Sequence, residues 1–211
     1  MNYTEIKELA LNYADRQDLE VINNIDNFMR VVEARVSKHI QVQKQSMRTR
    51  LLTSADQEYY GLPGDFNGLR DIEIANIDGT SRSTLAYLNP EQMNLATNTD
   101  QTISIEGENA QGYYTIIANQ VQIYPPVSDK LLEIVYYQKI PSLTSTETNN
   151  WLSDDNPDSY VFGILVEISS FVKDELAYKL WDTRFRQSLE EISKNDKDSR
   201  WSGTPLRVRI G

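Results

Sequence analysis

The spacing of apolar residues changes twice along this chain, and that change constrains the fold more than any other feature. Near the N-terminus apolar residues recur at steps of three and four, from Ile6 to Tyr13 and again from about Asp18 to Gln43. This spacing predicts two amphipathic helices. From about Met47 to Ile140 apolar and polar residues alternate as in half-buried strands. Helical spacing then returns, so we predict an α+β fold with a β-module inserted between two N-terminal and two C-terminal helices.

The second N-terminal helix has a continuous apolar stripe. Its members are Val21, Ile22, Ile25, Phe28, Met29, Val32, Val36 and Ile40. The residues predicted to lie opposite, on a solvated or interfacial face, are Asn24, Asp26, Asn27, Glu33 and Lys38.

The predicted β-module is antiparallel and built from short strands. Asp78-Gly79 lies between the alternating segments 69–77 and 83–88 and supplies the residue types of a tight hairpin turn. A brief helical turn is predicted after Pro90, and residues 97–112 are predicted to form a loop or projecting hairpin.

Helical structure is predicted to resume at Asn156-Pro157. Asn accepts hydrogen bonds from unpaired N–H groups at a helix start, and Pro suits the first helical position. Asp154, Asp155 and Asp158 are then expected at the positive end of the helix dipole. An apolar stripe from Tyr160 to Val172 is predicted to be the buried face of this helix. A second stripe from Tyr178 to Ile192 indicates either a separate helix or a bent continuation.

The last twelve residues differ in charge from the rest. They hold three arginines and no acid, whereas the whole chain has a formal charge of −10, which leaves −13 for residues 1–199. Apolar residues and arginines alternate after Thr204-Pro205, a pattern that suits strand addition to another chain. The alternative is a solubilising terminus without a partner. The candidate docking residues are Arg200, Trp201, Leu206, Arg207, Val208, Arg209 and Ile210.

These patterns predict four segments. They are the N-terminal helices (1–46), the inserted β-module (47–141), the C-terminal helices (142–199) and an extended basic tail (200–211). Trp151, Asn156, Pro157 and Asp158 mark the predicted structural junction between the β-module and the helices that follow.

The sequence lacks the residue sets of several kinds of site. With no cysteine and one histidine, His39, it contains neither a thiolate nucleophile nor a multi-histidine metal site. No glycine-rich phosphate-binding motif occurs. The acids around Asn156 lack calcium-loop spacing and are explained by helix capping. A two-carboxylate hydrolase stays open in principle, but nothing marks a particular pair. We assign no catalytic, metal or cofactor residue and predict that the protein is not an enzyme.

The charge of the chain and its N-terminal sequence limit the kinds of partner that we expect. The acidic balance argues against wrapping nucleic acid, since phosphate contacts need Lys or Arg. It is compatible with a surface past which DNA slides. The N-terminal segment has early acids and no long apolar run, so neither a signal peptide nor a membrane anchor is expected.

Three groups of residues together resemble one family. Leu62, Pro63, Asp65 and Phe66 form a Leu-Pro-x-Asp-Phe turn before a strand. A Tyr-Tyr strand runs from Tyr136 through Pro141 to Asn150-Trp151-Leu152, and Pro157-Asp158-x-Tyr160 opens the next helix. In order and spacing they resemble the head-to-tail adaptor, or connector, proteins of short-tailed bacteriophages.

The resemblance implies a virion structural protein made in the host cytoplasm and placed at the head–tail neck. Such adaptors form a ring, usually of twelve copies, beneath the portal protein. The ring extends the DNA channel used in genome ejection and carries the tail nozzle or tail fibre proteins. DNA is expected to pass without specific binding, and neither a cofactor nor a membrane is involved. Two alternatives stay open, a neck or tail-completion protein of another layer and a peptidoglycan hydrolase.

Overall fold

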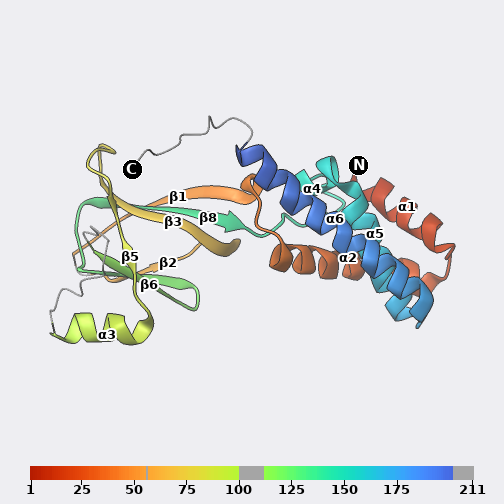
Figure 1. The fold of residues 1–211 in the computed structure, drawn as a ribbon, viewed down its shortest axis with the longest axis horizontal. Coiled ribbons are helices and arrows are strands. Elements are labelled where there is room, and N and C mark those ends of the chain that lie inside the picture. The colour runs from red at the N-terminus through yellow and green to blue at the C-terminus, as the bar shows by residue number, and fades with distance from the viewer. Residues whose placement is uncertain (56, 100–111, 202–211) are drawn as a thin grey trace, which may run out of the picture. The chain divides into compact units, whose positions relative to one another are not determined.

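The computed structural model describes residues 1–55, 57–99 and 112–201, and it confirms the α+β class (Figure 1). The chain divides into two compact units. We call Met1–Gln45 with Lys139–Gly211 the helical unit, and Ser46–Gln138 the β-module.

The helical unit is assembled around α5. Its elements are α1 (Tyr3–Ala14), α2 (Leu19–His39), the short 3-10 turn η1 (Gln43–Gln45), α4 (Trp151–Asp155), α5 (Pro157–Phe171) and α6 (Glu175–Trp201). Helix α5 packs against α1, α2 and α6. A Cβ at Gly163 would lie only 2.6 Å from Val32 Cγ1, so a residue without a side chain permits the close approach of α5 to α2. Five helices, counting the short α4, thus replace the predicted four in this part of the structure.

The predicted stripe of α2 is mostly correct. Val21, Ile25, Met29, Val32, Val36 and Ile40 are buried. Ile22, by contrast, is 37% exposed, and Glu33 is buried although we predicted it on the solvated face. Glu33 follows Met29 by four residues and precedes Val36 by three, a spacing that places it on the buried stripe. Its charge misled the prediction.

The two C-terminal stripes belong to separate helices. Helix α5 ends at Phe171, and Lys173 has a φ of 60°, a left-handed conformation that a continuous helix does not allow. The Asp174 carboxylate then accepts the Ala177 amide at 3.0 Å and caps the start of α6.

The β-module contains two four-stranded sheets. The first has the order β1 (Ser46–Leu52), β8 (Lys130–Gln138), β3 (Phe66–Asn76), β4 (Ser83–Thr84), and the second β2 (Tyr59–Gly61), β7 (Gln120–Tyr124), β6 (Tyr113–Ile117), β5 (Ala86–Tyr87). Both sheets contribute to one apolar core that includes Ile72, Ile134, Val121 and Ile123. The prediction of a wholly antiparallel module is wrong at one place, since β5 pairs with β6 in parallel.

The connection between β5 and β6 explains that parallel pair. Helix α3 (Pro90–Thr99) follows β5 directly, and a parallel pair needs a crossover rather than a hairpin. The predicted brief helical turn is therefore ten residues long, and it includes the first residues of the segment 97–112 that we predicted as a loop. Residues 100–111 of that segment lie outside the described residues. At the predicted hairpin, Gly79 has a φ of 79° and the Asn76 amide donates to the Thr80 carbonyl at 3.0 Å.

Candidate functional site at the return to the helical unit

The chain enters the helical unit again through residues 139–150, and α2 holds this segment with two polar side chains. The Leu143 amide donates to Glu33 Oε1 at 2.8 Å, and the Ile140 amide donates to Ser37 Oγ at 3.2 Å. Glu33 is 5% exposed. Its hydrogen bonds offset part of the cost of burying a carboxyl group and fix the path of the returning chain.

Asn150 connects this segment to two helices. Its Nδ2 donates to the Pro141 carbonyl at 2.6 Å and to the Tyr160 hydroxyl at 2.7 Å. Its Oδ1 accepts the Ser153 amide at 2.9 Å, which caps α4. The Tyr160 hydroxyl in turn donates to Glu33 Oε1 at 3.2 Å. One asparagine therefore links the returning chain, α4, α5 and, through Tyr160, α2.

The two ionisable members of this network, Glu33 and Tyr160, both have pKa values above their ordinary values. Burial raises the pKa of the Glu33 carboxyl above its ordinary value, although hydrogen bonds from Leu143, Ser142 and Tyr160 act in the opposite direction. Burial, together with the nearby charge of Glu33, also raises the pKa of Tyr160. The tyrosine therefore acts as a hydrogen-bond donor and acceptor that holds the helices together.

The acidic residues after Trp151 belong to two helices. Asp154 and Asp155 are the last residues of α4, where Asp154 accepts from Asn149 Nδ2 at 2.8 Å and Asp155 pairs with Lys44. Asp158 lies in the first turn of α5. Pro157 occupies the predicted first position of α5, but the Asn156 side chain makes no capping hydrogen bond. Asn156 thus occupies the predicted N-cap position of α5, but the predicted capping hydrogen bond is absent. The asparagine whose side chain caps a helix here is Asn150, at the start of α4.

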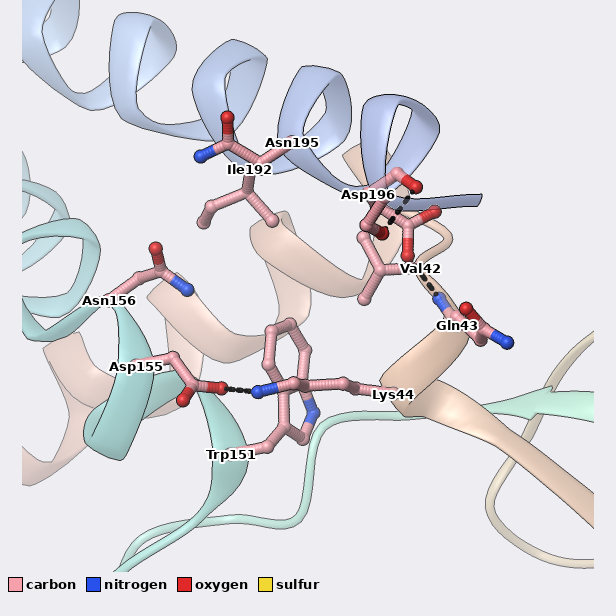
Figure 2. Close-up of a pocket in the computed structure, with 10 residues that line it drawn as sticks. Val42, Gln43, Lys44, Trp151, Asp155, Asn156, Ile192, Asn195 and Asp196 are labelled. Carbon is pink, nitrogen blue, oxygen red and sulfur yellow. Dashed lines mark hydrogen bonds and ion pairs between the residues drawn. The ribbon is translucent and has the colours of Figure 1, made fainter. Parts of the chain in front are cut away.

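A pocket of about 370 Å³ lies beside these residues, within the helical unit. Figure 2 shows the indole of Trp151 standing up from α4 toward α6, with Ile192 and Asn195 above it and Val42 beside it. Lys44 crosses in front of the indole to reach Asp155, and the Gln43 amide donates to Asp196 Oδ1 at 2.7 Å (Figure 2). The Trp151 Nε1 atom is buried and has no hydrogen-bond partner among the described residues.

The predicted docking tail lies mostly beyond what the structure describes. Arg200 and Trp201 are the last residues of α6, and Arg200 pairs with Asp196 one turn earlier at 2.6 Å. Residues 200 and 201, which we predicted as part of the extended segment, are thus helical, and this i,i+4 ion pair supports the last turn of the helix. Leu206, Arg207, Val208, Arg209 and Ile210 lie outside the described residues.

In the β-module, the Leu-Pro-x-Asp-Phe motif contacts the Tyr-Tyr strand motif. The Tyr136 hydroxyl donates to Asp65 Oδ1 at 3.0 Å, and the ring of Phe66 stacks on that of Tyr136 with 5.8 Å between centroids. Residues that are 71 positions apart therefore hold the turn before β3 against β8.

A charged cluster on the first sheet had no counterpart in our sequence predictions. Glu133 is 3% exposed and accepts from Arg50 Nε at 2.6 Å and from an Arg82 nitrogen at 2.9 Å. Arg48 Nε lies 3.3 Å from the same carboxylate. Burial acts to raise the pKa of Glu133, but the hydrogen bonds and charges of the arginines hold that pKa below its ordinary value. A signal was present, because Glu133 interrupts the apolar strand 131–136.

Two other kinds of feature, a metal site and a membrane-spanning helix, are absent from residues 1–55, 57–99 and 112–201. No group of three or more His, Cys, Asp or Glu residues there is arranged to hold a metal ion. Among the helices of this part of the chain, none is both long and apolar enough to cross a bilayer.

These observations define a two-unit α+β protein whose motif residues bind one another and support the fold. A family model described as SU10 adaptor protein matches residues 1–209. The chain belongs to this family of adaptor proteins. No curated protein matches the chain. The expected adaptor class is confirmed, while the assignment to short-tailed phages stays a prediction.

Proposed function

We propose that this protein is a head-to-tail adaptor in the neck of a short-tailed bacteriophage virion. Copies of the chain form a ring, of twelve in the expected case, beneath the portal protein. The ring extends the DNA channel and provides the platform on which the tail nozzle or tail fibre proteins assemble. The observation that carries this proposal is the match of the adaptor family to residues 1–209, which span both the helical unit and the β-module.

The chemistry of the motif residues supports a role based on shape. Asn150 and Tyr160 hold helices together, and Asp65 and Tyr136 hold a turn against a strand. Each of these polar groups is thus occupied by another part of the same chain. This arrangement suits a protein that presents rigid surfaces to partners, and we propose a non-enzymatic role.

The charge of the chain supports passage of DNA without specific binding. A formal charge of −10 repels phosphates wherever acids face a channel, so DNA is neither bound nor slowed there. Within the proposed function, the basic residues after Trp201 then serve protein docking to the portal or to a neighbouring copy, and not DNA contact.

Reconstitution with the portal protein tests the proposal. The purified chain is mixed with portal rings, and complexes are separated by sedimentation and imaged by electron microscopy. We expect an additional ring on the portal, with the same number of copies in each complex. Matched binding assays use the tail nozzle protein in place of the portal.

Other outcomes identify the alternatives. Binding to tail proteins in the absence of any portal complex identifies a neck or tail-completion protein of another layer. Turnover of peptidoglycan that is lost on replacing one specific Asp or Glu identifies a hydrolase. Either outcome refutes the adaptor function proposed above.

A further inference from the structure

We propose that the pocket beside Trp151 binds the chain's own C-terminal segment, residues 204–210, before assembly. This inference goes beyond the proposed function, because it concerns the isolated chain and not its place in a virion. It predicts that the docking residues are held by the helical unit until a partner competes for them.

An unused hydrogen-bond donor is the first observation. Trp151 Nε1 is buried without a partner among the described residues, and a buried donor left unpaired costs about 1–3 kcal/mol. A main-chain carbonyl oxygen of an extended segment is an acceptor of the right kind. The side chain of Lys44 crosses the indole (Figure 2) and must move aside. It is 59% exposed, so its displacement costs little.

The lining of the pocket matches the composition of the segment. Val42, Ile192 and the Trp151 ring form apolar wall, and Asp155 and Asp196 add carboxylates. The segment alternates Leu206, Val208 and Ile210 with Arg207 and Arg209. The Asp155 side chain is 40% exposed and pairs with Lys44. An arginine from the segment can replace that lysine and bind the carboxylate through two N–H groups.

The chain connectivity favours the segment of the same copy. Helix α6 ends at Trp201, two residues after Ser199, which lines the pocket. Only Ser202 and Gly203 separate the end of α6 from the segment 204–210. A short tether gives an effective concentration of about millimolar, far above the concentration of free copies in a dilute solution.

One open edge of the β-module, strand β1, is a less favourable receptor than the pocket. Strand β1 is an edge strand of the first sheet, and extended segments often add to such edges. Its Arg48 and Arg50 side chains converge on Glu133. A strand that carries Arg207 and Arg209 would place like charges opposite them, which is destabilising. The acidic pocket has the complementary charge.

The indole N–H signal of Trp151 in a nitrogen-15 NMR spectrum tests the proposal directly. The chain has three tryptophans, so the signal is assigned by its loss in Trp151→Phe. In the full chain we expect slow exchange of this proton with solvent. In the variant Arg207→Glu/Arg209→Glu we expect the signal to shift and the proton to exchange about tenfold faster, as loss of one buried hydrogen bond implies. The matched control, Lys173→Glu/Lys179→Glu, makes the same charge change at exposed positions near the start of α6 and should leave the signal unchanged.

Three results would overturn the proposal. The Trp151 signal could be the same in the tail variant as in the full chain. The control could shift it as much as the tail variant does. The shift could also depend on protein concentration, which would assign the pocket to the segment of a second copy. None of these measurements involves the portal, so failure here is distinct from failure of the adaptor function.

Discussion

Replacing Asn150 by alanine tests whether one buried asparagine supports the junction of the helical unit. Asn150 is only 8% exposed, and its side chain makes three hydrogen bonds, with Pro141, Ser153 and Tyr160. Loss of the cap of α4 costs about 1 kcal/mol. An unpaired carbonyl at Pro141 and a weakened Tyr160 add about 2–4 kcal/mol. We therefore expect the free energy of unfolding to fall by about 3–5 kcal/mol, a large part of the roughly 5–15 kcal/mol typical of a domain.

Urea denaturation followed by far-ultraviolet circular dichroism measures this loss. Asn150→Ser keeps a good capping residue but not the reach to Pro141 and Tyr160, so it should recover only the cap, about 1 kcal/mol relative to alanine. Two matched controls are Asn149→Ala, at an exposed neighbour, and Asn156→Ala, which has no side-chain capping bond. Each control should change stability by less than about 0.5 kcal/mol. A cost at Asn150 no larger than that of the controls would refute the reasoning.

Four further predictions concern other contacts. Gly163→Ala places a Cβ 2.6 Å from Val32 Cγ1 and should lower the free energy of unfolding by about 1–3 kcal/mol in urea denaturation. Adding Val32→Ala should restore part of this loss. An unchanged free energy of unfolding would contradict the close packing of α5 on α2. The pKa of Glu33 is higher in the folded state than its ordinary value of 4.5, so as pH rises the unfolded state loses the carboxyl proton at a lower pH than the folded state does. The free energy of unfolding should therefore fall as pH rises above 4.5. Glu33→Gln should remove that fall in a pH series, and an unaltered slope would contradict the assignment. The pKa of Glu133 is lowered, so its contribution to the free energy of unfolding is present above pH 4.5 and is lost as pH falls through the pKa of the folded state. Glu133→Gln should lower the free energy of unfolding by about 1–2 kcal/mol at neutral pH, since the arginines are half-exposed. No change in stability would show that the cluster is not stabilising. Deleting residues 202–211 should leave the circular dichroism spectrum unchanged and weaken portal binding in a pull-down assay. Unchanged binding would refute a docking role for the tail.

The residues after Trp151 show which part of a helix start a local sequence pattern can predict. The sequence predicted an asparagine cap followed by proline at a helix start, and Pro157 is the first residue of α5. Asn156 is the N-cap residue of α5 without a side-chain bond, and the capping bond is made by Asn150 at the start of α4. Both asparagines have the chemistry of a cap, and only the backbone conformation around each decides which side chain reaches an unpaired amide.

By itself the sequence determined the order and type of most elements. Hydrophobic spacing of three and four marked α2 and α5, alternation marked the strands, and Asp78-Gly79 marked a hairpin. These features depend on neighbours within a few positions, so they can be read from a single chain. The motif residues that indicated the adaptor family were also visible without a structure.

Only the tertiary structure decided which polar residues are buried and what each one binds. Glu33 meets Leu143 across 110 positions, and Glu133 meets Arg50 across 83. Because the cost of burying a charge depends on partners that arrive from distant segments, no local pattern predicts it. The pocket beside Trp151 has the same origin, since its walls come from residues 42–44 after α2, from α4 and from α6. Packing brings together residues that the sequence lists far apart, and the proposed binding of the C-terminal segment depends on that packing.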